Sequence, residues 1–465
     1  MKRHGKFAAA AALLCCAWLV RWRAADAQPA APGPEAPPPG TPGLEAPAVS
    51  DPMLAPPPAA PQELRSWDDA IAMLRRSPSY LTSAAEIERA AAQRRIALAA
   101  VLPTLTGSAG YAHNFNSVTV PMAAGPISVP PPTVWSATAT ASWNIINPRA
   151  IYGLGTADLA TSVANLSLAD RRRVLASSVV SALLATLAAA HTAELDRTGL
   201  RSALERLALT QTRLRFSRGT ELDVDRARQD VAVARAQLIS GDESLRQSRE
   251  ALGQALGSAT PIAAAAELDL EGFERAVAST CRLADSVERR ADVAAAAERV
   301  AIADRQIKDA ELLVSPSLAI GSTAGYASAV TLGPTTTWSV GATLTVPFYD
   351  GGARYGAIRE ARAAAEQARD ALASVRVEAM IEVARASRAI AVDTAARTVA
   401  KEQRDLAARI DARTREGYAK GVGTSLDLVI SAQALRQAEI NLVLLDFELA
   451  QAQAGAVLAN AECIY

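Results

Sequence analysis

Length, composition and charge set the first limits on this chain. Its 465 residues carry 48 basic and 48 acidic side chains, so the formal net charge at pH 7 is zero. A chain without a strongly basic face is a poor candidate for nucleic-acid binding, and no nucleic-acid partner is expected. Only 4% of the residues are aromatic, which favours long, closely packed helices over a bulky globular core.

The N-terminal region predicts export from the cytoplasm. Residues 1–27 combine a charged start, an apolar stretch from Phe7 to Val20 and the small-residue cleavage sequence Ala25-Asp26-Ala27, as in a secretory signal peptide. Residues 28–62 contain thirteen prolines and are expected to form a disordered linker. Beyond the signal we expect no apolar stretch near 18 residues, so membrane contact would depend on strands.

The rest of the chain repeats itself with a period slightly above 200 residues, which indicates a duplicated, domain-sized unit. The first unit is expected at 63–272 and the second at 273–465. Each unit reads as a helix, two strands and a long helical hairpin. The sequence echoes that support this division are Gly110-Tyr111 with Gly325-Tyr326, Trp135-Ser136 with Trp338-Ser339, and Gly219-Thr220 with Gly423-Thr424.

Four segments alternate apolar and small polar residues with a period of two, at about 104–115, 133–145, 317–328 and 337–348. Their length suits tilted strands that cross a membrane. A strand of an ordinary sandwich shows the same alternation, but the chain offers no apolar layer to cover these strands. The aromatic residues expected at the lipid interface are Tyr111, Trp135, Trp143, Tyr326 and Trp338.

Four strands are too few to close a barrel around a channel. Strands in lipid cannot leave their edges unpaired, because the hydrocarbon offers no hydrogen-bond partner. We therefore expect several copies of the chain to contribute strands to one barrel in the membrane. The sequence thus predicts an oligomer.

The helical hairpins are expected at about 150–257 and 353–460. Their apolar residues, many of them alanine, follow a heptad spacing over several turns, so each helix should pack against another helix. The turn of each hairpin carries a shared pattern in which a glycine ends the first helix and a threonine caps the second. The tip residues that we single out are Phe216, Arg218, Gly219 and Thr220 in the first turn, and Lys420, Gly421, Gly423 and Thr424 in the second.

Catalysis and cofactor binding find little support in the sequence. After the signal peptide only His113 and His191 remain, and they lie in different predicted elements. No zinc-protease, paired-cysteine, phosphate-loop or serine-hydrolase motif occurs. The protein is expected not to be an enzyme, and neither a metal nor another cofactor is expected.

Taken in their duplicated order, these features resemble the TolC-like outer-membrane efflux proteins, the outer membrane factors of tripartite efflux pumps. The resemblance covers nearly everything from Trp67 to Asn460. It implies a mainly helical fold with a small membrane β part. It also implies a homotrimer in which a 12-stranded outer-membrane β-barrel, four strands per chain, continues into a 12-helix periplasmic α-barrel. The implied partners are a periplasmic adaptor (membrane fusion) protein, an inner-membrane pump and outer-membrane lipid. The resemblance places the chain in the outer membrane, with a large periplasmic portion.

The resemblance also assigns roles at the tips. Asp427 matches the acidic residue that forms a ring at the narrow end of the tunnel, although its alternative role is to cap its own helix. Tyr418 and Asp223 match a tyrosine and an aspartate that link neighbouring hairpins in the closed state. The chain departs from the best-known members at Gly423, where some members place a basic residue, and at Ile430, where a second acidic ring would lie.

Three functions remain open from the sequence. The leading one is a passive exit duct for small molecules, and the second is the same duct serving type I polypeptide secretion. A periplasmic coiled-coil scaffold is the third.

Cys281 and Cys463 are the only cysteines after the signal peptide, and the oxidising periplasm permits a disulfide between them. Two unpaired thiols are the alternative.

Overall fold

The structure is a computed structural model that describes residues 49–465, apart from 122–124, 266–269, 284–285 and 331–332. The predicted signal peptide and the first part of the predicted linker lie outside the described residues. Everything below concerns the described part of the chain.

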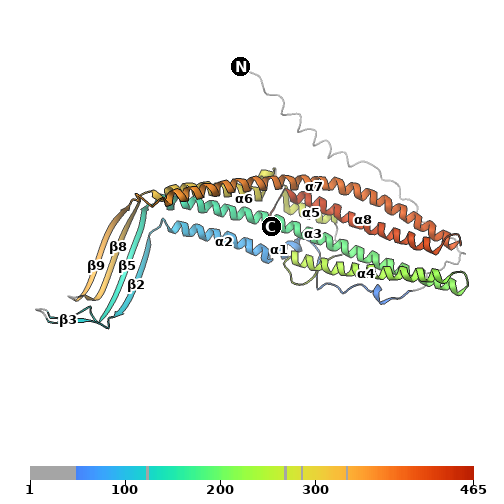
Figure 1. The fold of residues 1–465 in the computed structure, drawn as a ribbon, viewed down its shortest axis with the longest axis horizontal. Helices are drawn as coiled ribbons and strands as arrows, with labels where there is room; N and C mark the ends of the chain where they lie inside the picture. The colour runs from blue at the N-terminus through green and yellow to red at the C-terminus, as the bar shows by residue number, and fades with distance from the viewer. Residues whose placement is uncertain (1–48, 122–124, 266–269, 284–285, 331–332) are drawn as a thin grey trace, which may run out of the picture. The chain divides into compact units, whose positions relative to one another are not determined.

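Two long helical hairpins make up most of the described chain (Figure 1). The first consists of α3 (Pro148–Arg215) and α4 (Glu221–Ala255), and the second of α7 (Ala353–Ala419) and α8 (Ser425–Ala459). These bounds lie close to those predicted from the sequence. At 1.5 Å per residue, α3 is about 100 Å long. The hairpins pack together through contacts of α8 with both α3 and α4.

Two shorter helices complete a row of neighbouring helices. α2 (Pro78–Ala99) packs on α3, and α6 (Ala291–Glu311) packs on both α3 and α7, which gives the order α2–α3–α6–α7. Pro78 at the start of α2 needs no backbone donor there, and the Ser77 hydroxyl accepts a hydrogen bond from the Tyr80 amide at 3.3 Å. Each duplicated unit thus contributes one short and one long helix to this row.

The four predicted strands form one antiparallel sheet in the order β2–β5–β8–β9. Their bounds are β2 (Thr104–His113), β5 (Thr133–Ile146), β8 (Ser317–Val330) and β9 (Gly333–Thr345). α3 begins at Pro148, directly after β5, and ends at the first hairpin turn. The sheet and that turn therefore lie at opposite ends of α3, as Figure 1 shows.

In each duplicated unit, one small pair of strands joins the beginning of the unit to its end. β1 (Gln62–Leu64) pairs in parallel with β6 (Ile262–Ala264), which follows the first hairpin. β7 (Cys281–Leu283) pairs antiparallel with β10 (Ala461–Cys463), which follows the second hairpin. The beginning and the end of each unit are therefore held side by side.

The remaining elements are short. The predicted boundary between the units, at 272/273, falls inside α5 rather than between two elements. A hairpin of two three-residue strands in the loop between β2 and β5 was not predicted. The short elements, including this hairpin of β3 and β4, are α1 (Trp67–Leu74), α5 (Leu270–Thr280), β3 (Val118–Val120), β4 (Ile127–Val129) and the 3-10 helices η1 (Pro52–Leu54), η2 (Val287–Arg289) and η3 (Leu312–Val314).

Residues 49–62, which we expected to belong to a disordered linker, instead lie against the first hairpin. Met53 and Leu54 pack on a buried cluster formed by α3 and α4. Arg235 forms an ion pair with Asp51 at 2.7 Å, and Arg249 donates to the Pro58 carbonyl at 3.1 Å. The proline content does not reveal the apolar and charged contacts that hold this segment in place.

The largest buried cluster brings both units together. It joins the middle of α3 with α1, the end of α4 and the end of α8. The expectation that no long apolar stretch follows the signal was wrong, because windows of α3 and α8 are apolar enough to cross a membrane by length and composition. In α3 this stretch includes Val179, Leu183 and Leu187, which are buried in the cluster. Packing between helices therefore accounts for its composition.

Candidate functional site: the sheet faces and the helix tips

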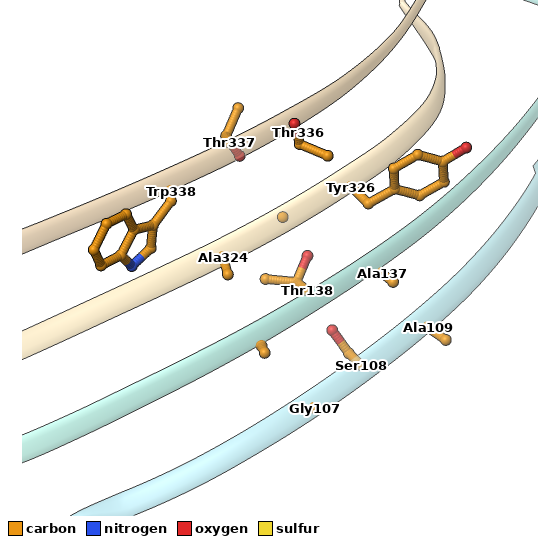
Figure 2. Close-up of a pocket in the computed structure, with 12 residues that line it drawn as sticks. Gly107, Ser108, Ala109, Ala137, Thr138, Ala324, Tyr326, Thr336, Thr337 and Trp338 are labelled. Carbon is orange, nitrogen blue, oxygen red and sulfur yellow. The ribbon is translucent and has the colours of Figure 1, made fainter.

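The register of the sheet places the predicted apolar positions of all four strands on one face. Tyr111 lies opposite Trp135, Ala137 opposite Tyr326, and Ala324 opposite Trp338. Residues directly opposite each other in an antiparallel sheet point to the same side. Figure 2 shows Tyr326 and Trp338 on neighbouring strands, with alanines between them and β2, around a shallow hollow that crosses the sheet.

The aromatic residues on this apolar face are exposed in the single chain, and two of them, Trp143 and Trp338, also donate hydrogen bonds. The rings of Tyr111 and Trp135 are 4.7 Å apart between centroids. The indole N–H of Trp143 donates to the Val101 carbonyl at 3.1 Å, and that of Trp338 donates to Ser322 at 3.0 Å. An aromatic ring with one satisfied polar group is typical of a membrane interface.

The opposite face of the sheet carries small polar residues. Thr104 and Ser142 share a hydrogen bond of 2.8 Å between their hydroxyls. A Cβ atom at Gly325 would lie 2.9 Å from the Thr337 hydroxyl, so a glycine leaves room for the neighbouring threonine. A face of Thr, Ser and Gly is suited to water, whereas the apolar face is suited to lipid.

Each outer strand of the sheet has one edge without a partner strand in the described part of the chain. β2 pairs with β5 alone, and β9 pairs with β8 alone. Such edges expose rows of N–H and C=O groups that must find partners inside a membrane. The sheet is therefore incomplete as a membrane-spanning structure.

At the other end of α3, the two hairpin tips use the same capping box. The Thr220 hydroxyl accepts from the Asp223 amide at 3.2 Å, and Asp223 accepts from the Thr220 amide at 3.1 Å. The Thr424 hydroxyl likewise accepts from the Asp427 amide, and Asp427 from the Thr424 amide, both at 3.2 Å. The predicted caps of α4 and α8 are both present, and reciprocal hydrogen bonds of this kind fix the first turn of a helix.

The glycine predicted to end the first helix of each hairpin is correct only for the second tip. Gly421 adopts the left-handed conformation with φ of 81°, whereas at the first tip Ser217 does so with φ of 56°. The amides of Arg218 and Val422 donate back to Arg213 and Gly417, at 2.9 and 3.0 Å. The first tip therefore places a non-glycine residue where glycine is usual.

Side chains from the two tips also contact each other. The Ser425 hydroxyl donates to Asp223, and this hydrogen bond, together with those from Thr220, holds the pKa of Asp223 below its usual range. The Arg213 guanidinium lies 4.0 Å from the centroid of the Tyr418 ring and donates to the Tyr418 carbonyl at 3.1 Å. Within the described chain, the Tyr418 hydroxyl makes no hydrogen bond to Asp223.

Asp427 has a simpler environment. The Thr424 hydroxyl and amide donate to its carboxylate and lower the pKa of Asp427. The other tip residues are mostly exposed: Phe216 is 71% exposed and Val422 is 86% exposed, and Lys420 pairs with Glu416. Arg213 and Ser425 were missed by the sequence reasoning, although Ser425 lies inside the repeated turn pattern.

A buried ionic cluster in the helices near the tips was also not predicted from the sequence. Arg206 pairs with Asp230 at 2.5 Å, and Gln433 donates to the other oxygen of Asp230 at 3.0 Å. This cluster joins α3, α4 and α8. Nearby, burial raises the pKa of Asp196 and lowers the pKa of Arg436. Charged residues in a helical seam look like a solvated face in the sequence, so only the packing reveals them.

Cys281 and Cys463 form a disulfide in the structure, between directly paired residues of β7 and β10. The bond lies where the second unit closes on itself. Within the described ranges, the structure groups no three His, Cys, Asp or Glu side chains in a way that could hold a metal ion.

Comparison with known proteins identifies the chain. The outer membrane efflux protein family matches residues 72–258 and 283–460, one segment in each duplicated unit. A search of curated proteins found no match.

Solved structures share the fold at low sequence identity. The CmeC outer membrane channel of Campylobacter jejuni superposes with a TM-score of 0.73 at 15% identity, covering 84% of both chains. A membrane protein from Pseudomonas aeruginosa gives 0.70 at 22% identity, with 89% of this chain and 99% of that chain covered. The open state of the MtrE outer membrane channel of Neisseria gonorrhoeae gives 0.69 at 19% identity, with 84% and 88% covered.

The matching family is one of outer membrane efflux proteins, and the CmeC and MtrE structures are outer membrane channels. The two faces of the sheet and the long helices described above agree with that setting. The chain therefore belongs to the outer membrane efflux protein family and forms an outer-membrane exit duct of a tripartite efflux system.

Proposed function

We propose that three copies of this chain assemble into one duct, which passively conducts small molecules and is gated at the helix tips. The observation that carries this proposal is the pair of free edges on β2 and β9. With four antiparallel strands per copy, β9 of one copy runs antiparallel to β2 of the next. The edges can therefore pair and close a barrel without a parallel junction.

The number of copies follows from the space that a barrel encloses. Two copies would give an eight-stranded barrel, whose interior side chains fill. Three copies give twelve strands, within the range of known outer-membrane barrels, and agree with the trimer implied by the family resemblance. The face that carries Thr104, Ser142 and Thr337 would then line the lumen with small polar groups. The apolar face would meet lipid.

The helices extend this duct into the periplasm. Three copies of the row α2–α3–α6–α7 give twelve neighbouring helices around the same axis. The open ends of the row, α2 and α7, would meet across the boundary between copies, as β2 and β9 do. The heptad seams of the helices support such packing.

We assign the gate to the tips, where three copies of Asp427 would converge on the axis. Like charges brought close together favour cations. The energy for transport would come from an inner-membrane pump, which a periplasmic adaptor connects to the tips. The proposed docking residues are Phe216, Arg218, Gly219, Thr220, Lys420, Gly421, Gly423 and Thr424.

The decisive test is the state of the protein extracted from membranes. A trimer that requires detergent and forms channels in planar bilayers supports the proposal. A protein that carbonate releases as a monomer, without conductance, refutes it and favours a periplasmic scaffold.

The choice of small molecules has its own test. Under this proposal, cells that lack the chain should become sensitive to small toxic compounds. Retention of an exported polypeptide instead would overturn the choice of small molecules.

A further inference from the structure

A hollow at the junction of the sheet and the helices has no assigned role. Its lining comes from the end of β5, the first turn of α3, the last turns of α6 and the start of η3. Ile146, Ile151 and Leu312 supply apolar surface, and Arg305 and Lys308 supply two positive charges. The volume of about 630 Å³ lies within the range of ligand pockets, roughly 300–1,000 Å³.

The hollow continues the apolar face of the sheet. An irregularity in β5 between Asn144 and Ile146 shifts the register, so that Ile146 lies opposite Leu318. Leu318 in turn lies opposite Leu344 on the apolar face. Trp143, three residues before Ile146, is an exposed aromatic on the same face. The hollow therefore lies where the lipid-facing surface ends and the helices begin.

A second copy of the chain would not cover this hollow. It lies between α3 and α6, the two central helices of the row α2–α3–α6–α7. The strands that join these helices, β5 and β8, are likewise the central strands of the sheet. Contacts between copies would form at the outer elements, so the occupant must come from the surroundings of the protein.

The charged side of the hollow is held in a defined position. Arg305 donates to the Tyr152 carbonyl at 2.7 Å and to the Thr156 hydroxyl at 3.1 Å, and it lies 4.0 Å from the centroid of the Tyr152 ring. A Cβ atom at Gly155 would come within 2.5 Å of this guanidinium. The glycine therefore leaves room for the Arg305 side chain.

Lys308 is the more accessible cation. It pairs with Glu311 at 3.0 Å, with 54% of its side chain exposed. A lysine carries three donors, so this ion pair leaves others for a ligand. An anionic group placed here would have apolar surface on one side and water on the other, as a lipid phosphate does.

We propose that this hollow binds one glycerophospholipid of the periplasmic leaflet per chain. An acyl chain would lie on Ile146, Ile151 and Leu312, and the phosphate would contact Lys308 beside Arg305. The proposal depends on the outer-membrane location of the family and not on the number of copies in the assembly. If the protein is found not to be a trimer, the proposed lipid site is unaffected. If the lipid site is refuted, the proposed trimer is unaffected.

The test uses the purified full-length protein in mild detergent, with added palmitoyl-oleoyl phosphatidylethanolamine, followed by native mass spectrometry. The parent should bind one phospholipid per chain. Lys308→Glu should weaken that binding about tenfold, equivalent to about 1.4 kcal/mol, close to the lower end of what a hydrogen bond to a charged group contributes. Ile151→Asn should have a similar effect through lost apolar contact, about 1.5 kcal/mol for a buried side chain. Lys401→Glu, at an exposed lysine on α7, is the matched control and should bind like the parent.

Three results would overturn the proposal: no lipid on the parent, equal binding by the parent and Lys308→Glu, or displacement of the lipid by millimolar inorganic phosphate, which would indicate an anion site alone. Lys308→Ala serves as the second variant if charge reversal disturbs folding, and it should also weaken binding. A change in oligomer mass without lipid loss would show that the hollow is a contact between copies, and would equally refute a lipid site.

Discussion

The two hairpin tips share one backbone design but hold their side chains differently. Both use a Thr-x-x-Asp capping box with nearly equal distances. At the first tip, however, Asp223 also accepts a hydrogen bond from Ser425 of the second tip. Asp427 bonds only within its own turn, as far as the described residues show. One carboxylate is thus engaged between hairpins, and the other remains available to its surroundings.

The aromatic residues of the two tips also differ in their surroundings. Tyr418 is 8% exposed and lies beneath Arg213, whereas Phe216 is 71% exposed. A capping box is local and depends on four consecutive residues, so duplication preserves it easily. Contacts between the tips depend on both hairpins, and there the two copies have diverged. The second tip is built into the packing, and the first tip presents its ring to solvent or to a partner.

The largest effect should come from removing the buried ring. Tyr418→Ala deletes a packed aromatic side chain and its contact with Arg213, and should destabilise the tips by about 3 kcal/mol. This corresponds to a loss of about 100-fold in hydrogen-exchange protection at the start of α8. Phe216→Ala is the control and should leave protection unchanged. Equal losses in the two variants would show that the difference in burial between the tips does not exist in the assembled protein.

The capping boxes should respond equally. Thr220→Ala and Thr424→Ala each remove a side-chain acceptor at a helix start and should cost about 1 kcal/mol in the first turn of α4 or α8. Hydrogen exchange at those turns measures the effect. Thr220→Ser and Thr424→Ser keep the acceptor and should retain protection. An effect confined to one tip would contradict the shared backbone design.

Sequence patterns predicted those parts of the fold that depend on local alternation and capping. The faces of the sheet follow from the period of two, and the caps from Thr220 and Thr424. The left-handed residue at the first tip was misplaced because Gly219 suggested the usual solution, whereas the chain bends at Ser217.

Contacts between distant helices were not predictable from the same patterns. The ionic cluster of Arg206, Asp230 and Gln433 consists of residue types that normally face water, and it is buried only because three helices meet. The Ser425 hydrogen bond to Asp223 likewise joins residues about 200 positions apart. No periodicity within one helix records such a pairing.

Acidification should weaken the link between the tips. The lowered pKa of Asp223 means that its hydrogen bonds stabilise the folded tips above the ordinary pKa of about 3.9 and are lost as pH falls through the lowered value. Single-channel recordings should show open probability rising as pH is lowered below the ordinary pKa of an aspartate. Ser425→Ala should raise open probability at pH 7 about fivefold, equivalent to about 1 kcal/mol, and should respond less to acid. Identical pH responses in parent and variant would exclude this bond from gating.

Ion selectivity should separate the two carboxylates. Asp427→Asn removes the charge proposed to line the axis and should lower the cation-to-anion permeability ratio in planar bilayers. Asp223→Asn, whose carboxylate is engaged by Ser425, should change open probability while the ratio stays near that of the parent. If Asp427→Asn leaves the ratio unchanged, Asp427 serves only to cap α8.

The smallest effect should come from the Tyr418 hydroxyl. Tyr418→Phe keeps the ring beneath Arg213 and removes only a phenolic donor, so selectivity should be retained. We expect open probability to rise, because the hydroxyl is proposed to reach Asp223 of a neighbouring hairpin in the closed assembly. The rise should be smaller than that caused by Ser425→Ala, since Ser425 already bonds Asp223 within the chain. A larger rise in Tyr418→Phe would show that the contact between copies, and not the one within the chain, keeps the duct closed.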